Sequence, residues 1–173
     1  MKKIWVLLFA VGIVHLSYGQ KNKKIFSKRS LQEQVVGTWA LVSVDNIYPD
    51  SSRVHPYGDE PQGLLIFDTK GNYAIQILKA TRPKIVSGDK NKCTPEENAM
   101  MVQGSNSHFG TYAVDEARKT ITFNIAHASF PNWEGTVQKR SYTYTNNEIR
   151  YVVTHTTQGG QSVIAEVAWR RLY

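Results

Sequence analysis

The sequence contains very little cysteine. Cys93 is the only one among 173 residues. A single thiol excludes an intramolecular disulfide, so the fold must be held together by its core. No activating motif accompanies this thiol, which therefore predicts no catalytic role. The residues from Leu31 onward are enough for one domain with a sizeable core.

Motifs for catalysis and metal binding are also missing. Neither a Gly-x-Ser-x-Gly turn nor a phosphate-binding glycine loop occurs. The histidines after residue 20 match none of the His-x-His, His-x-x-x-His or His-Glu-x-x-His spacings. We therefore predict no metal site, no cofactor and no catalytic residue by motif. An enzyme that acts through dispersed residues is left as an alternative.

A positive charge excess is missing from the part that folds, although the formal net charge is +7. Seven of the 21 Lys and Arg residues precede Leu31, whereas all 14 Asp and Glu residues follow it, so each sign contributes 14 charges from Leu31 onward. A nucleic-acid-binding domain carries its positive excess on the folded surface. We therefore expect no nucleic-acid partner.

The N-terminus predicts export. Two lysines precede an apolar run over residues 4–16, and a segment of small residues ends at Gly19. This order is typical of a secretory signal peptide, and the run is shorter than the roughly 20 residues that span a bilayer. An uncleaved membrane anchor is the alternative. We expect a periplasmic or secreted protein without a transmembrane segment after signal removal, divided into a signal peptide (1–19), a basic tail (20–30) and one domain (31–173).

After the tail, the chain reads as short strands separated by turn residues. The first strand is largely apolar on both faces. The late loops are short, and this rhythm is typical of up-and-down barrels. The predicted fold is therefore all-β: an eight-stranded antiparallel up-and-down β-barrel. Such a barrel either fills itself with side chains or holds one small ligand. The expected strands are 35–44, 63–68, 72–78, 109–114, 120–127, 137–145, 148–156 and 162–171.

Two helices are expected beside the strands. Ser30 with Glu33 forms a capping box that predicts a short N-terminal helix. Thr94 with Glu97 predicts a second helix inside the long loop 79–106. Loops of this length are often functional, so we expect this one to cover an end of the barrel, with two methionines of the helix on its underside.

The first and last strands indicate how the barrel closes. Gly37 and Trp39 lie on the first strand, and Arg170 and Arg171 lie near the end of the last. We expect Trp39 to plug one end of the barrel and one of the two arginines to lie across its ring. Such a pair combines apolar burial with a cation–π contact worth about 0.5–2 kcal/mol.

An ordered set of motifs runs along the chain from residue 36 to residue 171. It consists of Val36-Gly37-Thr38-Trp39, Leu41-Val42-Ser43, Arg53, Pro56-Tyr57-Gly58, Pro61, Gly63-Leu64-Leu65-Ile66-Phe67, Phe109-Gly110-Thr111-Tyr112, Val114-Asp115, Phe130-Pro131-Asn132-Trp133, Gly135, Arg140 and Trp169-Arg170-Arg171. In this order the chain resembles the lipocalin-like domain family of small bacterial and fungal proteins. The resemblance covers Leu31 to the C-terminus.

The resemblance implies a β-barrel with a hydrophobic ligand cavity. In typical lipocalins the tryptophan of Gly-x-Trp packs at the closed end against an arginine from the final strand, which here corresponds to Trp39 with Arg170 or Arg171. The sequence departs from that pattern because it lacks the structural disulfide and the usual spacing of the middle motifs. We therefore do not infer a retinoid-like or haem-like ligand for this chain from the resemblance.

Strand periodicity suggests which polar residues face the interior. His127 and His155 end strands in phase with apolar or aromatic residues, which predicts inward faces near a barrel mouth. For each histidine, a hydrogen-bonded structural role is the alternative to a catalytic one. Arg140, if inward, suits a carboxylate or phosphate headgroup; otherwise it faces solvent or pairs with Glu134 or Glu166. Trp133 lies either at the rim of the mouth or in a packed corner.

These expectations lead to three hypotheses of function. The first is binding of a small hydrophobic or amphipathic molecule in the barrel. The second is a cavity enzyme, an isomerase, cyclase or hydratase that uses His127, His155 or Arg140. The third is an interaction module that presents the loop 46–62 to a protein. The sequence does not predict an oligomeric state. The candidate ligand-binding residues are Tyr73, Tyr112, His127, Trp133, Arg140, Tyr142, Tyr151 and His155.

Overall fold

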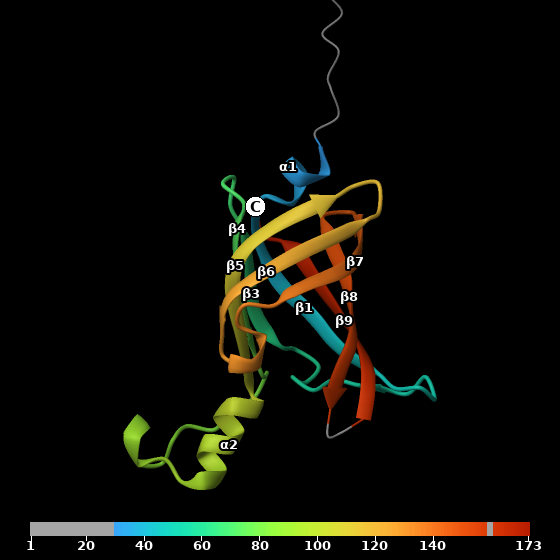
Figure 1. Ribbon diagram of the computed structural model, residues 1–173. Coiled ribbons are helices and arrows are strands. Elements are labelled where there is room, and N and C mark those ends of the chain that lie inside the picture. The colour runs from blue at the N-terminus through green and yellow to red at the C-terminus, as the bar shows by residue number, and fades with distance from the viewer. Residues whose placement is uncertain (1–29, 159–160) are drawn as a thin grey trace, which may run out of the picture.

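The computed structural model describes residues 30–158 and 161–173 (Figure 1). The side chains of residues 155–161 are not described. The expected signal peptide over 1–19 and the basic tail before Ser30 lie outside the described residues. Apart from Ser30, the described residues belong to the domain expected over 31–173.

The described chain forms a closed antiparallel β-barrel, which confirms the predicted fold (Figure 1). Eight strands pair in the order β1-β3-β4-β5-β6-β7-β8-β9, and β9 pairs back with β1. The two-residue β2 pairs only with β1. The strands are β1 (Gly37–Ile47), β2 (Arg53–Val54), β3 (Gln62–Phe67), β4 (Asn72–Leu78), β5 (Ser105–Asp115), β6 (Thr120–Ala128), β7 (Val137–Thr145), β8 (Glu148–Gln158) and β9 (Gln161–Arg171).

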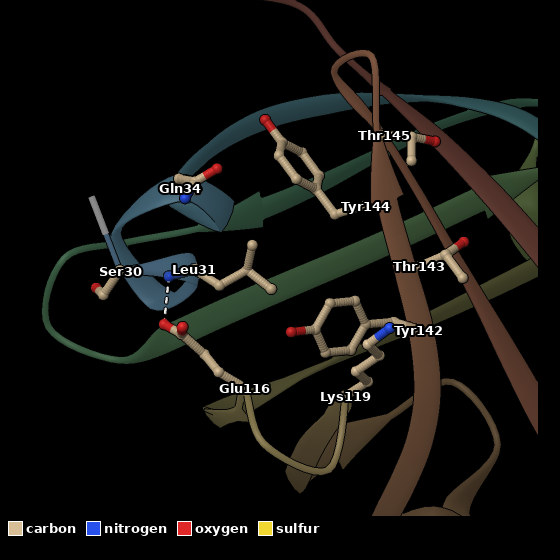
Figure 2. Close-up of a pocket in the computed structure, with 9 residues that line it drawn as sticks. All are labelled: Ser30, Leu31, Gln34, Glu116, Lys119, Tyr142, Thr143, Tyr144 and Thr145. Carbon is tan, nitrogen blue, oxygen red and sulfur yellow. Dashed lines mark hydrogen bonds between the residues drawn. The ribbon is translucent and has the colours of Figure 1, made fainter. Parts of the chain in front are cut away.

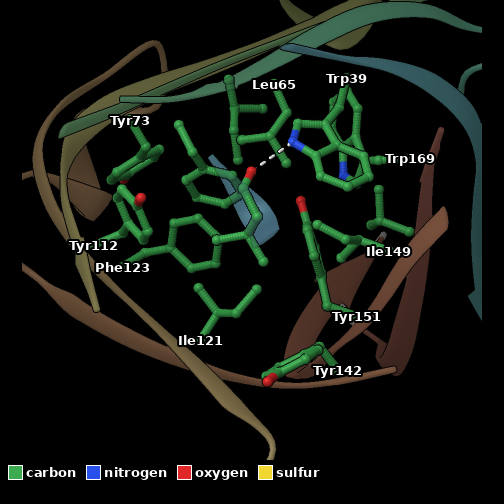
Figure 3. Close-up of a cluster of buried hydrophobic side chains, with 14 of the residues drawn as sticks. Trp39, Leu65, Tyr73, Tyr112, Ile121, Phe123, Tyr142, Ile149, Tyr151 and Trp169 are labelled. Carbon is green, nitrogen blue, oxygen red and sulfur yellow. Dashed lines mark hydrogen bonds between the residues drawn. The ribbon is translucent and has the colours of Figure 1, made fainter. Parts of the chain in front are cut away.

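Side chains alternate between the barrel interior and the outside. In β4, for example, Tyr73, Ile75 and Ile77 are buried, whereas Ala74 and Gln76 between them are exposed. This follows from the two-residue side-chain period of a strand. The inward side chains form one core, which Figure 3 shows around Phe123 and Tyr151.

The two ends of the barrel are built differently. At one end, called the closed end here, tight turns join β3 to β4, β5 to β6 and β7 to β8, beside the helix α1 (Leu31–Val35) (Figure 1). The β7–β8 turn holds Asn146 and Asn147 at φ 50° and 60°, the left-handed conformation that a tight hairpin needs. At the opposite, open end are the longer connections, including the loop 79–104.

Both predicted capping boxes are confirmed. The Ser30 side chain accepts from the Glu33 backbone in α1, and the Thr94 side chain accepts from the Glu97 backbone at the start of α2 (Pro95–Gln103). The helix α2 has no buried residue and projects away from the barrel (Figure 1). Two short 3₁₀ helices complete the described elements, η1 (Lys90–Lys92) and η2 (Pro131–Trp133). Across the described residues, none of the helices has the length and apolar character needed to cross a membrane.

Candidate functional site

The closed end is sealed by Trp39 and Arg171. The Trp39 ring is fully buried, and its indole N–H donates to the Val35 carbonyl over 2.9 Å. The Arg171 guanidinium lies over this ring, with Cζ 4.3 Å from the ring centroid. It also donates to the backbone carbonyls of Gln34 and Val36, which the end of a helix leaves without intrahelical partners. Arg170 is exposed and instead donates from Nη2 to Oε2 of Glu148 over 3.4 Å.

Gly37 is required by this arrangement for two reasons. Its φ is +140°, a conformation that side chains with a Cβ rarely adopt. A Cβ at this position would also lie 2.6 Å from Nη1 of Arg171. The glycine of the Gly-x-Trp motif therefore leaves room for the guanidinium that covers the tryptophan.

A second group of polar side chains lies inside the barrel. We call it the interior polar cluster; its members are Tyr73 on β4, His108 on β5, and Gln138 and Arg140 on β7. Tyr73, His108 and Arg140 are each less than 5 % exposed. They come from three strands whose alternation points these positions inward, so long-range strand pairing brings them together.

Arg140 is the centre of this cluster. Its Cζ lies 4.5 Å from the ring centroid of Phe123 and 4.8 Å from that of Tyr151. The Nη2 atom donates to Oε1 of Gln138 over 2.7 Å and contacts Nε2 of His108 at 3.3 Å. Of the two orientations left open for Arg140, the structure therefore shows the inward one. The alternative partners Glu134 and Glu166 lie beside His127 and Arg150 instead.

The guanidinium determines which ring nitrogen of His108 carries the proton. An arginine side chain has donors and no acceptor, so Nε2 of His108 must accept from Arg140 and carry no proton. The Nδ1 atom then carries the proton and donates to the Tyr73 oxygen, 2.8 Å away. Burial and the adjacent charge of Arg140 lower the pKa of His108 to about 3. Burial also raises the pKa of Tyr73, so its hydroxyl stays protonated and can donate to a further group.

One fully buried N–H in the cluster has no partner within the described part of the chain. It is Nε of Arg140, which is buried. A buried donor that is left without an acceptor costs about 1–3 kcal/mol, so this N–H needs an acceptor in the folded protein. Such groups call for an explanation in function.

Four of the predicted ligand-binding residues meet around His108. Tyr73 is bonded to it, Trp133 packs edge-on against it at 5.9 Å between ring centroids, and Arg140 and Tyr151 lie next to each other beyond it. Trp133 is half-buried on η2, in the connection between β6 and β7 on the open-end side. Of the two positions considered for Trp133, the structure therefore shows the packed corner, beside the interior polar cluster.

The other predicted tyrosines lie elsewhere. The hydroxyl of Tyr112 donates to the Asp68 carbonyl over 3.0 Å in the β3–β4 turn, at the closed end. Tyr142 is buried near the same end, and its hydroxyl has no partner among the described residues. Neither tyrosine hydrogen-bonds to the interior polar cluster in the described structure.

The inward orientation predicted for His127 is wrong. Its side chain is on the outer surface, with its ring tilted against that of Phe109 and its Nδ1 atom 3.4 Å from Glu134. The cause is a β-bulge, because the β5–β6 register shifts between Phe109 and Gly110. Gly110 permits it: a Cβ there would lie 2.0 Å from the Asn124 carbonyl oxygen. The extra residue inverts the alternation at the end of β6.

His155 lies on β8, and its side chain is outside the described residues. Among the described side chains, those of residues 30–154 and 162–173, no group of three or more His, Cys, Asp or Glu residues converges as a metal site would need. Two side chains of the loop 46–62, which was considered as an interaction surface, are held by the buried carboxylate of Asp45. Nδ1 of His55 lies 2.8 Å and Nη1 of Arg53 lies 3.2 Å from its oxygens.

Large side chains occupy the middle of the barrel, where the resemblance implied a cavity (Figure 3). A cavity of about 460 Å³ lies at the closed end between α1 and the end of β7, lined among others by Leu31 and Tyr142 (Figure 2). Another, of about 520 Å³, lies between α2 and residues 82–90. Met100 and Met101 line this second cavity, so they do not form the underside of a lid over the barrel. No member of the interior polar cluster lines either cavity.

Sequence reasoning missed His108. The strand was predicted to begin at residue 109, whereas β5 begins at Ser105 and pairs with β4 over its whole length. A signal was available, because His108 has the same parity as Gly110 and Tyr112 and so belongs to the inward face of an extended strand.

The architecture identifies the structural class of the protein. An eight-stranded antiparallel barrel with one sealed end and convergent polar groups inside it belongs to the barrels that can hold one small molecule. The family model of the lipocalin-like domain matches residues 36–172. The chain therefore belongs to the lipocalin-like domain family, as its motifs predicted. A search of curated proteins found no match to this chain.

Proposed function

We propose that this protein binds one small amphipathic molecule inside the barrel. The polar end of the molecule would contact the interior polar cluster, and its apolar part would lie among the surrounding aromatic rings. The observation that carries this proposal is the cluster itself: convergent donors within an apolar shell. A few placed polar groups in an apolar lining are what orients a ligand in binding sites.

Binding requires some side chains to move, because those of the protein fill the interior. Trp133 is the best candidate, since it covers His108, is half-buried and belongs to a three-residue 3₁₀ helix between two strands. Its neighbour Phe130 is half-exposed and packs edge-on against it. Rotation of Trp133 would open the cluster toward the open end without breaking strand pairing.

Export belongs to the same proposal and is supported by the N-terminal sequence alone. The basic, apolar and small-residue segments over residues 1–19 are those of a signal peptide. Expression of the full chain in a bacterial host, followed by fractionation and N-terminal sequencing, tests this. We expect a periplasmic or secreted product that begins at Gln20; an intact N-terminus in the cytoplasm would contradict export.

The binding proposal is tested by extracting the purified protein with organic solvent and identifying the released molecules by mass spectrometry. We expect a small amphipathic compound in wild-type protein and markedly less of it in Trp133→Ala, because the ring that retains the compound is gone. Phe109→Ala, on the outer surface, is the matched control and should retain the wild-type amount. Absence of any carried compound, together with no binding of added amphiphiles, would contradict the proposal.

A cavity enzyme is the second candidate, and the convergence of Tyr73, His108 and Arg140 favours it. Proton transfer by His108 is unfavourable at neutral pH, because its pKa is lowered to about 3 and Arg140 occupies its acceptor nitrogen. The chemistry within reach is stabilisation of a developing oxyanion by the donors of Tyr73 and Arg140. Conversion of the extracted compound by fresh protein, followed by mass spectrometry, would distinguish an enzyme from a binding protein.

A further inference from the structure

We propose that the polar end of the bound molecule is an acid group carrying one negative charge, and that Arg140 is its counter-ion. This inference rests on the proposed function and specifies its ligand class. It follows from the charge of the buried guanidinium and from where the acidic residues of the chain lie.

Arg140 is a buried cation without an anion. It is 4 % exposed, and an arginine side chain stays protonated in proteins. Its hydrogen-bond partners in the structure are the neutral amide of Gln138 and the neutral ring of His108. No Asp or Glu among the described residues forms an ion pair with it.

The rest of the chain cannot supply the missing charge. The side chains of all 14 acidic residues are described. The residues whose side chains are not described, 1–29 and 155–161, contain no Asp or Glu. The C-terminal residue Tyr173 is 87 % exposed, at the other end of β9 from the open end. A counter-charge for Arg140 must therefore come from outside the polypeptide.

The surroundings of Arg140 favour an anion over a neutral polar group. A buried charge normally has a paired partner, because desolvation of an unpaired ion is costly. The faces of two aromatic rings compensate part of that cost through cation–π contacts. The unpartnered Nε–H of Arg140 and the hydroxyl hydrogen of Tyr73 are two donors suited to carboxylate oxygens.

The charge balance also indicates a single negative charge. His108 lies against Arg140 and is held neutral, so the cluster contains one cation, and a dianion would leave a buried negative charge unpaired. A straight-chain or aromatic carboxylic acid has the required chemistry: one acid group and an apolar body for the rings of Phe123 and Tyr151.

The test compares acids with alcohols of matched apolar bodies. Dodecanoic acid with 1-dodecanol, and 2-naphthoic acid with 2-naphthol, are titrated into the mature protein at pH 8 by calorimetry. We expect an acid to bind at least about tenfold more tightly than its alcohol, the factor that one lost charge-assisted contact removes. In Arg140→Met the acid should bind about as weakly as the alcohol, whose affinity stays unchanged.

Arg150→Met is the matched control, because Arg150 is a surface arginine paired with Glu148 and Glu166. It should keep the acid preference. If Arg140→Met fails to fold, as judged by circular dichroism, Arg140→Lys replaces it; that variant retains the charge but loses Nε, and its acid preference should fall several-fold.

The remaining outcomes separate the two proposals. Equal binding of acid and alcohol, or an acid preference that survives in Arg140→Met, overturns the anion inference and leaves amphipathic binding standing. Failure of all four probes to bind overturns the proposed function and the inference with it.

Discussion

Two arginines of this barrel lie over aromatic rings in opposite surroundings. At the closed end, Arg171 covers Trp39 and donates to two backbone carbonyls at the end of α1. In the interior, Arg140 lies over the rings of Phe123 and Tyr151, is buried, and has an Nε–H without a partner among the described residues. The acceptors of both arginines are neutral groups; the difference is that Arg171 is only partly buried, whereas Arg140 is almost fully buried.

The difference separates a structural role from a binding role for the same type of side chain. Arg171 satisfies helix-end carbonyls that would otherwise lack partners, so its contacts serve the fold alone. The contacts of Arg140 leave both charge and hydrogen bonding incomplete. A fold optimised for stability alone would favour an apolar residue there. The closed end is therefore expected to control stability, and the interior polar cluster to control binding.

The largest effect is expected from Trp39→Ala. The ring is fully buried, and truncation of a buried tryptophan costs about 3–5 kcal/mol through lost transfer free energy and the cavity left behind. Chemical denaturation followed by tryptophan fluorescence measures the change. The preference for acid over alcohol should stay as in wild type.

Trp133→Ala is the control for this substitution, since Trp133 is half-buried and should lose less unfolding free energy while changing ligand retention. The comparison would fail if Trp39→Ala kept full stability but lost its acid preference, because Trp39 would then belong to the binding site.

Arg171→Met and Arg140→Met test the two arginines directly. Arg171→Met should lower the free energy of unfolding by about 2 kcal/mol, because it removes charge-assisted bonds and leaves carbonyls unpaired. Arg140→Met should change it by less than about 1 kcal/mol, since the removal of an uncompensated buried charge offsets the lost contacts with Gln138 and His108. Urea denaturation of both variants measures the difference. A larger loss in Arg140→Met than in Arg171→Met would make Arg140 the structural residue.

The fold was predictable because local rules agreed with one another along the chain. Strand-like segments bounded by turn residues identified all eight barrel strands, and two capping boxes identified both α-helices. The pair of Trp39 with a C-terminal arginine followed from motifs on the first and last strands. Such features depend on residues close in sequence, or on how a sheet must close.

The interior polar cluster was only partly predictable, because it depends on strand register. Periodicity placed Arg140 on one face with Gln138 but left open whether that face is inward, and Tyr73 was named only as an aromatic residue suited to line a pocket. His127 was misassigned because a bulge inverts the face of β6, and the β5 residue Gly110 that accommodates it is only a weak signal. His108 was missed because strand length is set by pairing with β4 rather than by its own residues.

A moderate, pH-dependent effect is expected from His108. Its pKa in the folded protein is lowered to about 3 from an ordinary value of 6.5, so below pH 6.5 the unfolded chain binds a proton that the folded chain does not. Stability is therefore lost as the pH falls from 6.5 toward 3. Between pH 7 and 5.5 the wild type should lose about 1 kcal/mol more than His108→Gln, measured by urea denaturation at each pH.

The control for this pH dependence is His127→Gln, because His127 lies on the outer surface and contacts Phe109 and Glu134 instead of Arg140. It should keep the wild-type dependence on pH. If His108→Gln and wild type showed the same slope, His108 would not be held neutral by the guanidinium, and the charge balance of the cluster would have to be revised.

The smallest change in stability is expected from Tyr142→Phe. This variant tests whether the closed end contributes to ligand binding. The Tyr142 hydroxyl is buried and has no partner in the described structure, so its removal relieves a desolvated polar group and should leave the free energy of unfolding unchanged or raised by less than about 1 kcal/mol. Tyr112→Phe is the matched comparison: it removes a bond to the Asp68 carbonyl and should cost about 1 kcal/mol. Both variants should bind dodecanoic acid as wild type does in calorimetry. Weaker binding of dodecanoic acid by Tyr142→Phe would show that the ligand site reaches the closed end. The closed end would then not be purely structural.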